Sequence, residues 1–448
     1  MARVEENLPL LRPEAKIHPG LRRHLRRLKN VYGKQKERVS MRAVKINSIA
    51  FNNLVNRYDT GRIRLQKKVS RIIDGVRRDG DKALLRYTKM FDKIDIPRKD
   101  LLVTEAEISG AYQDIKPEIV NTLKEIIRNI NKFYTNQVPK SWSIKQESGI
   151  ELGEKFVPIE RVGVYVPSGT VPLVSSVYMT VLPAKIAGVK KIVMVSPPNK
   201  YKSIDPYILV VANLLKVDEI YKIGGAQAIA ALAFGTKTVS KVDKIVGPGN
   251  EYVTEAKRQV FGYCDIDMLA GPSEVLIIAN RYANIDYLKR DVMAQAEHHK
   301  GLSILVTPSR RVFNALRKDK DTPGYIIKVK NLETAADISN MIAPEHLQLM
   351  VKSPKRVLKN ITNAGAIFLG QYSPVAIGDY IAGPSHVLPT GGTAKYSSGL
   401  NLRSFIKSSH IISYSRKALS NSAGWVKEIA ELEKLENHWL SVKQRCDG

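Results

Sequence analysis

Short β-rich runs alternate with helical segments over much of this chain, and this alternation is the feature that most restricts its fold. The runs are 163–166, 191–196, 219–223, 244–246, 274–279, 302–306, 325–329 and 365–369. Strands separated by helices are typical of a parallel, doubly wound sheet with helices on both faces. We therefore expect an α/β protein.

The rest of the chain is mainly helical. Residues 62–78 keep mostly helical spacing of apolar positions, and Thr104 and Glu107 have the spacing of a capping box that opens one or two helices reaching about residue 137. A last helix is predicted for about 423–442. The helical region up to residue 137 carries no evident chemical motif, whereas the last helix carries Glu433 and His438.

The bulk composition is that of an ordinary globular protein. The chain has 448 residues, 44% of them hydrophobic and 25% charged, which is enough for two or more domains. No run of about 18 apolar residues predicts a membrane span, and the first residues lack the apolar stretch of a secretory signal. Cys264 and Cys446 are far apart, so we expect no disulfide framework and a cytoplasmic location.

The net charge of +28 is unusual and could indicate a nucleic-acid partner. Residues 1–40 carry eleven Lys and Arg against four Asp and Glu, a balance of +7, and the remaining +21 is spread without a dense block. A poorly ordered basic extension explains 1–40 better than a binding arm, because no nucleic-acid-binding motif accompanies it. A nucleic-acid-binding protein would show salt-sensitive RNA or DNA affinity, whereas the activity of an enzyme should not change when residues 1–40 are removed.

Glycine-containing turns follow three of the predicted strands, where open α/β sheets bind ligands. They are Pro167-Ser168-Gly169, Gly224-Gly225-Ala226-Gln227 and Gly247-Pro248-Gly249-Asn250. Gly224-Gly225 leads into a predicted helix over 226–234 whose amino terminus suits a phosphate. Neither a GxGxxG motif nor a P-loop is present, and an ordinary strand-to-helix turn explains any one of these turns better than a binding site does.

A polar cluster closes the predicted helix that begins near residue 285. Gln295 and His298 are three residues apart, so on a helix they would share one face and could hold one ion or ligand. From the residues alone, Glu297 would rank above Gln295 as a zinc ligand. Glu345 and His346 follow Pro344 at a predicted break in regular structure, where they could be reactive or could simply cap a helix.

Eight motifs in one order resemble the histidinol dehydrogenase family, over Met41 to Arg445. They are Arg161-Val162-Gly163-Val164-Tyr165-Val166-Pro167, Gly224-Gly225-Ala226-Gln227, Gly247-Pro248-Gly249-Asn250, Ala270-Gly271-Pro272-Ser273-Glu274, Gln295-Ala296-Glu297-His298, Ala343-Pro344-Glu345-His346, Gly378-Asp379-Tyr380 and His386-Val387-Leu388-Pro389-Thr390. The resemblance implies oxidation of L-histidinol to L-histidine in two NAD-dependent steps, with zinc holding the substrate and a retained aldehyde.

The resemblance also implies roles for individual residues. Glu345 and His346 match the acid/base pair, and Tyr165, Gln227 and Asn250 match positions that contact NAD. The implied zinc ligands are Gln295, His298, Asp379 and His438. The implied substrate contacts are Ser273, Gln295, His298, His346, Asp379, Glu433 and His438. We expect His386 to border the site and assign no role to His299 or His410.

The architecture implied by the resemblance has two Rossmann-like domains of the aldehyde-dehydrogenase-like type with helical arms at both ends. We expect the first domain at 41–164 and 275–395, the second inserted at 165–274, and a C-terminal helical arm at 396–448 that crosses to the partner subunit of a homodimer. A relative acting on another amino alcohol or a sulfonated diol remains an alternative, although Glu433 and His438 argue for an imidazole substrate.

The chain departs from the usual family pattern at a few places. The turn after Tyr165 reads Pro-Ser-Gly where Pro-Gly-Gly is common, and Ser385 stands where Asn is common. The segment between His298 and Glu345 is shorter than usual by about one helix. None of the residues assigned to zinc or to acid/base chemistry is lost, so we expect a trimmed surface and retained activity.

Overall fold

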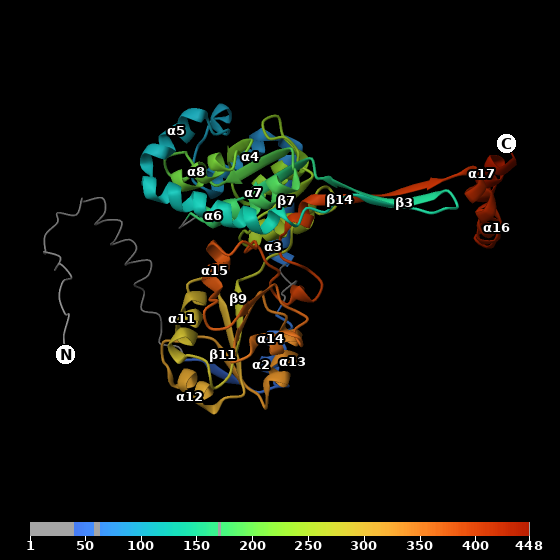
Figure 1. Cartoon of the computed structure of the whole chain (residues 1–448). Helices are drawn as coiled ribbons and strands as arrows, with labels where there is room; N and C mark the ends of the chain where they lie inside the picture. Colours follow the sequence, from blue (N-terminus) through green and yellow to red (C-terminus); the bar gives the residue numbers. More distant parts are fainter. Residues whose placement is uncertain (1–39, 58–62, 169–171, 448) are drawn as a thin grey trace, which may run out of the picture.

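Two parallel β-sheets, each covered by helices on both faces, form the body of the protein, and a long antiparallel arm projects from it (Figure 1). The computed structural model describes residues 40–57, 63–168 and 172–447. The expectations for residues 1–39 and for Gly169 to Val171 in the altered turn lie outside these ranges. Within the described ranges, no helix has the length and apolar character needed to cross a membrane.

The first sheet has six parallel strands in the order β1-β11-β10-β9-β12-β13. Its strands are β1 (Arg42–Val44), β9 (Glu274–Ala279), β10 (Leu302–Thr307), β11 (Tyr325–Lys328), β12 (His346–Met350) and β13 (Ala366–Leu369). One face packs on α11 (Ile285–Gln295) and α12 (Arg310–Lys318), and the other on α2 (Ile49–Val55), α13 (Leu332–Ile342) and α14 (Pro354–Leu358).

The second sheet has five parallel strands in the order β6-β5-β4-β7-β8. Its strands are β4 (Arg161–Tyr165), β5 (Lys191–Ser196), β6 (Glu219–Lys222), β7 (Lys244–Val246) and β8 (Asp265–Ile266). One face packs on α3 (Ile63–Asp79), α4 (Asp81–Phe91), α9 (Gly225–Phe234) and α10 (Glu251–Val260). The other face packs on α5 (Glu105–Asp114), α6 (Pro117–Thr135), α7 (Val174–Ala187) and α8 (Pro206–Leu214).

Both sheets have the same winding. In each, a first strand (β4 or β9) lies in the middle, the next two strands add on one side, and the fourth and fifth add on the other side. The reversal point lies between β4 and β7 in the second sheet and between β9 and β12 in the first. Parallel strands with helices on both faces confirm the α/β fold with two Rossmann-like units.

The distribution of helices differs from the predicted division at 41–164 and 165–274. Helices α3 to α6 were assigned to the first unit, but their apolar faces share hydrophobic clusters with the second sheet. Strand β4 also belongs to the second sheet, although it lies almost entirely before residue 165. The strong amphipathic character of α3 and α6 predicts that each helix has a buried face. The spacing of apolar residues does not identify the sheet against which that face packs.

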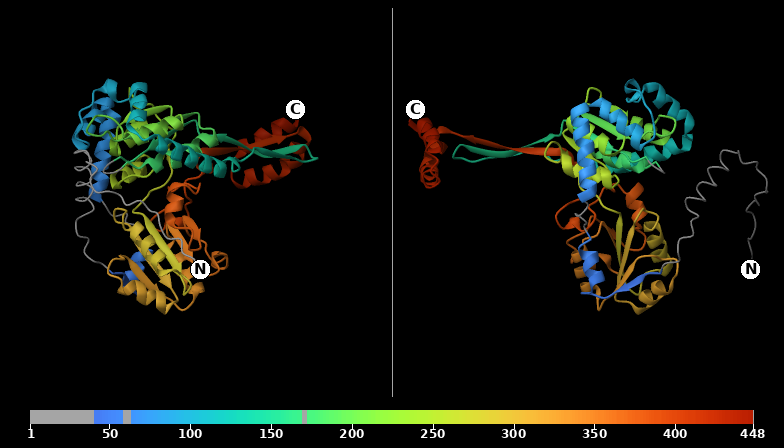
Figure 2. Two further views of the ribbon diagram at one scale, coloured as in Figure 1. Left: turned by 60° about the vertical axis from the view of Figure 1, so that its left-hand side comes forward. Right: turned by 180° about the vertical axis from the view of Figure 1, so that it is seen from behind.

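A helical arm was predicted at 396–448, but the antiparallel ribbon that forms the first part of the projecting arm was not. Strands β2 (Trp142–Lys145), β3 (Ile150–Pro158) and β14 (Ile406–Tyr414) form an antiparallel ribbon, and β14 leads to α16 (Arg416–Leu432) and α17 (Glu436–Asp447). Figure 2 shows from two further directions that the ribbon carries the terminal helices away from the body. The single helix expected at 423–442 is two helices, because Lys434 adopts a positive φ of 58° at the turn between them.

Most of the predicted strands agree with the structure, and β5, β7 and β9 have the predicted bounds. The predicted capping box is also confirmed: Thr104 and Glu107 bond each other's backbone N–H groups at the start of α5. The predicted break at Glu345-His346 is wrong in one respect, because His346 begins strand β12. That strand is buried throughout, although its first four residues alternate between polar and apolar types, so the alternation does not mark a half-exposed strand here.

Candidate functional site

Glu345 and His346 lie at the amino end of β12, beside Glu274 at the amino end of β9. The Glu274 backbone N–H donates to Glu345 Oε2 at 2.8 Å, and His346 Nδ1 lies 2.9 Å from the Glu274 carbonyl oxygen. Both side chains are buried. Because a carbonyl oxygen only accepts, Nδ1 carries the hydrogen of the neutral imidazole, and Nε2 is left to exchange a proton with a ligand.

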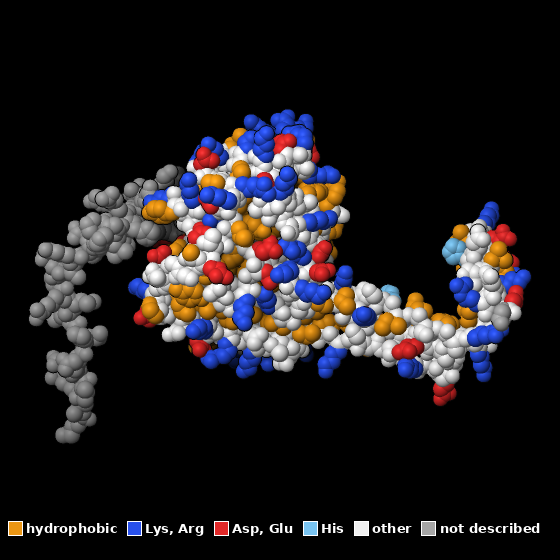
Figure 3. All heavy atoms as spheres, turned by 90° about the horizontal axis from the view of Figure 1, so that it is seen from above, with side chains coloured by type: hydrophobic (Ala, Val, Ile, Leu, Met, Phe, Trp, Pro, Cys, Tyr) orange, Lys and Arg blue, Asp and Glu red, His pale blue; other side chains and the backbone are white. Residues whose placement is uncertain are grey.

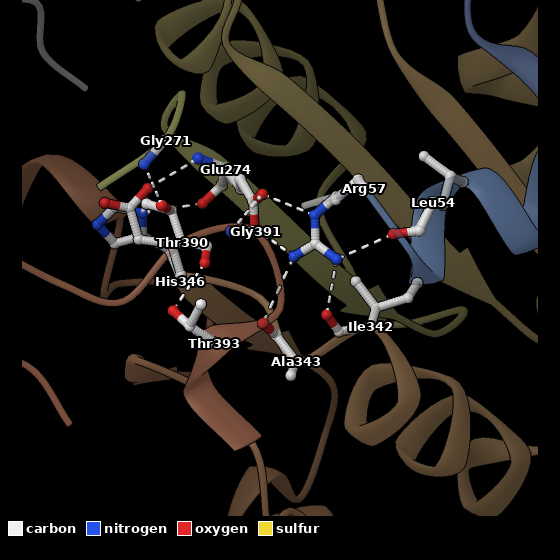
Figure 4. Close-up of polar contacts among 11 residues, drawn as sticks. Leu54, Arg57, Gly271, Glu274, Ile342, Ala343, His346, Thr390, Gly391 and Thr393 are labelled. Carbon is white, nitrogen blue, oxygen red and sulfur yellow. Dashed lines mark hydrogen bonds and ion pairs between the residues drawn. The ribbon is translucent and has the colours of Figure 1, made fainter. Parts of the chain in front are cut away.

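Glu274 is itself held by an arginine from far along the chain. Arg57 Nε donates to Glu274 Oε1 at 2.6 Å, and a second guanidinium nitrogen contacts the other carboxylate oxygen (Figure 4). Gly391 N–H donates to the same carboxylate at 3.0 Å. The remaining Arg57 donor bonds the carbonyl oxygens of Leu54 and Ile342 at 2.9 and 2.8 Å. The strand end that supports the acid/base pair is therefore fixed by a satisfied buried ion pair.

Asp379 faces the outer nitrogen of the imidazole. It lies in α15 (Val375–Tyr380), and its Oδ1 is 3.8 Å from His346 Nε2. Gly378 permits this approach, since a Cβ there would come within 2.7 Å of the Phe368 ring. Glycine at position 378 therefore lets the following residue, Asp379, approach His346, because a larger side chain at 378 would collide with Phe368.

The charge environment of His346 favours its protonated form. Burial disfavours the cation, but the carboxylates of Glu345 and Asp379 and the Glu274 carbonyl outweigh this effect and raise the pKa of His346 to about 9. This pKa is higher than the near-neutral value expected of a general base. Two carboxylates around one imidazole are the physical reason, and a cationic ligand beside them would oppose the shift.

The predicted zinc ligands are only partly assembled within one chain. Gln295 is buried at the end of α11 and its Nε2 has no hydrogen-bond partner, so after an amide flip its oxygen could face a cation. His298 is exposed, in a turn after α11 where its N–H bonds the Gln295 carbonyl at 3.2 Å, so the expected position on the helix itself is wrong. Among the described residues, no group of three or more His, Cys, Asp or Glu side chains could hold a metal.

The remaining predicted ligand lies on the arm. His438 is in α17 and Glu433 is at the end of α16, both exposed and beyond the ribbon (Figure 1). The structure therefore does not bring either residue to Glu345 and His346 of the same chain. Ser273, by contrast, directly precedes Glu274 at the start of β9 and so lies next to the acid/base pair.

The three residues matched to NAD contacts lie near the carboxyl ends of strands of the second sheet: Tyr165 ends β4, Gln227 is in α9 after β6, and Asn250 follows β7. Tyr165 is buried, and its hydroxyl accepts from Gly225 N–H at 3.1 Å. Gln227 is buried with neither amide atom partnered, which leaves donor and acceptor capacity for a polar ligand. Asn250 caps α10 by accepting from the N–H groups of Tyr252 and Val253 at 3.0 and 3.2 Å.

Comparison with known proteins gives one consistent result. A family model described as histidinol dehydrogenase matches residues 55–321 and 314–446. The histidinol dehydrogenase of Clostridium acetobutylicum is 45% identical over 413 residues, with 88% of this chain and 95% of that protein covered. That of Caldanaerobacter subterraneus subsp. tengcongensis is 46% identical over 413 residues, with 88% and 96% covered.

The chain belongs to the histidinol dehydrogenase family. A solved histidinol dehydrogenase from Elizabethkingia anophelis has the same fold with a TM-score of 0.84 and 35% identity, covering 91% of this chain and 98% of that one. The family resemblance read from the eight motifs is thereby confirmed, as is the interpretation of the chain as an enzyme of this family.

Two residues near the acid/base pair of this histidinol dehydrogenase family member were not assigned from the sequence. Arg57 gave no signal, because it is one of many basic residues and its partner lies 217 positions away. His386 was expected only to border the site. Its Nε2 is buried without a partner, burial lowers its pKa, and the charges of Asp379 and Glu345 act on its ring. The sequence signal that could have assigned His386 to the site is its position as the first residue of the family motif His386-Val387-Leu388-Pro389-Thr390.

Proposed function

We propose that this protein oxidises L-histidinol to L-histidine by a retained L-histidinaldehyde, with two NAD⁺ and one zinc ion per site, as part of histidine biosynthesis in the cytoplasm. The observation that carries the proposal is the buried Glu345-His346 pair, held by the Glu274 backbone with Asp379 at 3.8 Å from His346. This arrangement offers one group that accepts protons and a second that can orient water.

The first oxidation requires loss of the hydroxyl proton as hydride leaves for NAD⁺. His346 accepts that proton at Nε2, because Nδ1 is committed to the Glu274 carbonyl. Its raised pKa requires that it first lose its own Nε2 proton, which a cation bound beside it would favour. The second oxidation requires water to add to the aldehyde. Glu345 takes a proton from this water as it adds to the aldehyde. After His346 has released its first proton to solvent, it takes the hydroxyl proton of the hydrate as the second hydride leaves for the second NAD⁺. The Glu274 N–H bonds one carboxylate oxygen of Glu345 and fixes its direction.

Gln295, His298 and Asp379, together with the partner subunit's His438, would hold zinc through nitrogen and oxygen atoms that suit this ion. When bound there, zinc supplies a positively charged template for the imidazole and amino groups of the substrate. Ser273 and the partner subunit's Glu433 would contact the substrate. Tyr165, Gln227 and Asn250 would contact NAD at the reversal point of the second sheet.

The surface of the arm supports the proposal that a second copy of the chain supplies its arm to this site. The ribbon and terminal helices expose large apolar side chains, among them Ile144, Ile412, Trp425 and Leu432, which are 61, 71, 71 and 78% exposed. Figure 3 shows orange hydrophobic side chains along the arm. An apolar surface of this kind in a monomer indicates an interface, so we assign it to a homodimer in which each arm reaches the partner's site.

The test is the stoichiometry of complete turnover with L-histidinol, NAD⁺ and zinc. Two NADH per histidinol consumed, lost on addition of a chelator and restored by zinc, is the expected result. One NADH per substrate with free aldehyde in solution would overturn the two-step reaction. Turnover of another amino alcohol in preference to histidinol would overturn the substrate assignment.

A further inference from the structure

A cavity lies at the edge of the first sheet opposite the acid/base pair. Its volume is about 560 Å³, and it is formed mainly by loops that follow β9, β10 and β12 and by the start of α13. Glu274 and His346 are at the amino ends of β9 and β12, whereas the cavity opens at their carboxyl ends. The two sites are separated by the length of these strands, roughly 17 Å, so the cavity is not part of the site described above.

The cavity occupies the topological switch point of the first sheet. After β9 the chain adds β10 and β11 on one side and then returns to add β12 on the other. The loops that begin at Asn280, after β9, and at Lys352, after β12, both line the cavity. Ligands of open α/β sheets bind in the crevice at such a reversal. The proposed NAD contacts lie at the equivalent reversal of the second sheet, between β4 and β7.

The lining is basic. Arg281, Lys352 and Arg356 contribute three positive charges, against one carboxylate from Glu333. The starts of α12 and α13 also reach the cavity, where Ser309 and Asn331 cap the two helices. The first turn of α12 contains no acidic residue. Arginine and lysine side chains beside helix amino termini form a site for an anion, above all for a phosphate.

The shape and sequence of the loops restrict the ligand to a small one. Among the residues that the structure describes, no glycine lines the cavity, whereas Gly224 and Gly225 bring the backbone close at the equivalent crevice of the second sheet. A diphosphate needs such close backbone approach. The volume is within the range of small-ligand pockets. Tyr282 is half exposed at the rim, with Lys352 Nζ 5.3 Å from its ring.

We propose that this cavity is a second ligand site that binds a phosphate monoester of up to mononucleotide size. The phosphate is held by Arg281, Lys352 and Arg356 near the starts of α12 and α13, and the organic part lies toward Tyr282. The site is independent of histidinol and of the NAD crevice.

Isothermal titration of the full chain with AMP tests this proposal, with NAD⁺ present at saturation to fill the other crevice. The expected result is one site per chain, also occupied by ribose 5-phosphate and displaced by excess inorganic phosphate. Arg356→Gln and Lys352→Gln should each weaken AMP binding at least fivefold. Lys318→Gln, an exposed change in the last turn of α12 outside the lining, should leave it unchanged.

Glu333→Gln separates the proposal from a general loss of structure, because removing the only carboxylate in the lining should tighten AMP binding about threefold or more. Absence of AMP binding in the native chain would overturn the proposal. Binding that NAD⁺ abolishes, or that neither Arg356→Gln nor Lys352→Gln weakens, would overturn it as well.

Discussion

Arg57 clamps the buried carboxylate of Glu274 across 217 residues of sequence, and through Glu274 it fixes the strand end on which Glu345 and His346 rest. The ion pair is almost fully buried, since the side chains of Arg57 and Glu274 are 11 and 5% exposed. The positions of Glu345 and His346, the proposed acid/base pair, therefore depend on the charge of Arg57.

Arg57→Met should strongly destabilise the protein. Removing one partner of a buried ion pair leaves the other charge uncompensated, at a cost of about 3 kcal/mol or more. Urea unfolding measures the loss, and the kcat of any folded enzyme should fall at least tenfold with a smaller change in KM. The double variant Arg57→Met/Glu274→Gln should recover part of the stability, and Arg317→Gln, on the exposed side of α12, serves as the control. A single variant as stable as the native chain would contradict the clamp.

His346→Asn and His298→Asn should separate proton transfer from metal binding. Without the imidazole at 346 we expect turnover to fall at least a hundredfold while zinc content stays near that of the native enzyme. His298→Asn should instead lose most of its zinc, because a proposed ligand is gone. Zinc analysis of the purified proteins decides between these roles. Loss of metal from His346→Asn would show that ligand and base had been confused.

Mixing two inactive variants should restore activity if the arm completes the partner's site. In a heterodimer of His346→Asn and His438→Asn chains, one site combines both defects and the other has neither. After unfolding and refolding the mixture, about a quarter of native activity is expected, since half of the dimers carry one intact site of two. Each variant refolded alone is the control. No recovery in verified heterodimers would place His438 in its own chain's site.

Asp92 should make stability fall as the pH rises. It follows α4, its Oδ2 is buried without a partner, and burial raises its pKa to about 6. Between about pH 4 and pH 6 the unfolded chain has lost this proton while the folded chain keeps it, so stability declines through that window. Asp92→Asn should therefore stabilise the protein at pH 7.5, by about 1 kcal/mol after allowance for partial exposure, and by less at pH 5. Urea unfolding at both pH values checks this; an equal effect at both would contradict it.

The sequence by itself determined most strands of the two parallel sheets, the capping box and the family, because these depend on local periodicity and on short motifs with fixed spacing. It also located Glu345, His346, Asp379 and Gln295. It could not assign α3 to α6 to the second sheet. The amphipathic pattern of a helix predicts that one face is buried, but it does not identify the sheet against which that face packs.

Only the tertiary structure decided which groups meet. The polar residues His346 and Gln348 are buried because β12 lies between β9 and β13, and Arg57 pairs with Glu274 over a sequence distance that no spacing rule covers. The antiparallel ribbon pairs β3 with β14 across more than 240 residues, which local pattern does not specify. The same holds for the cavity between β9 and β12, which exists because the chain reverses its winding there, and winding order is a property of packing.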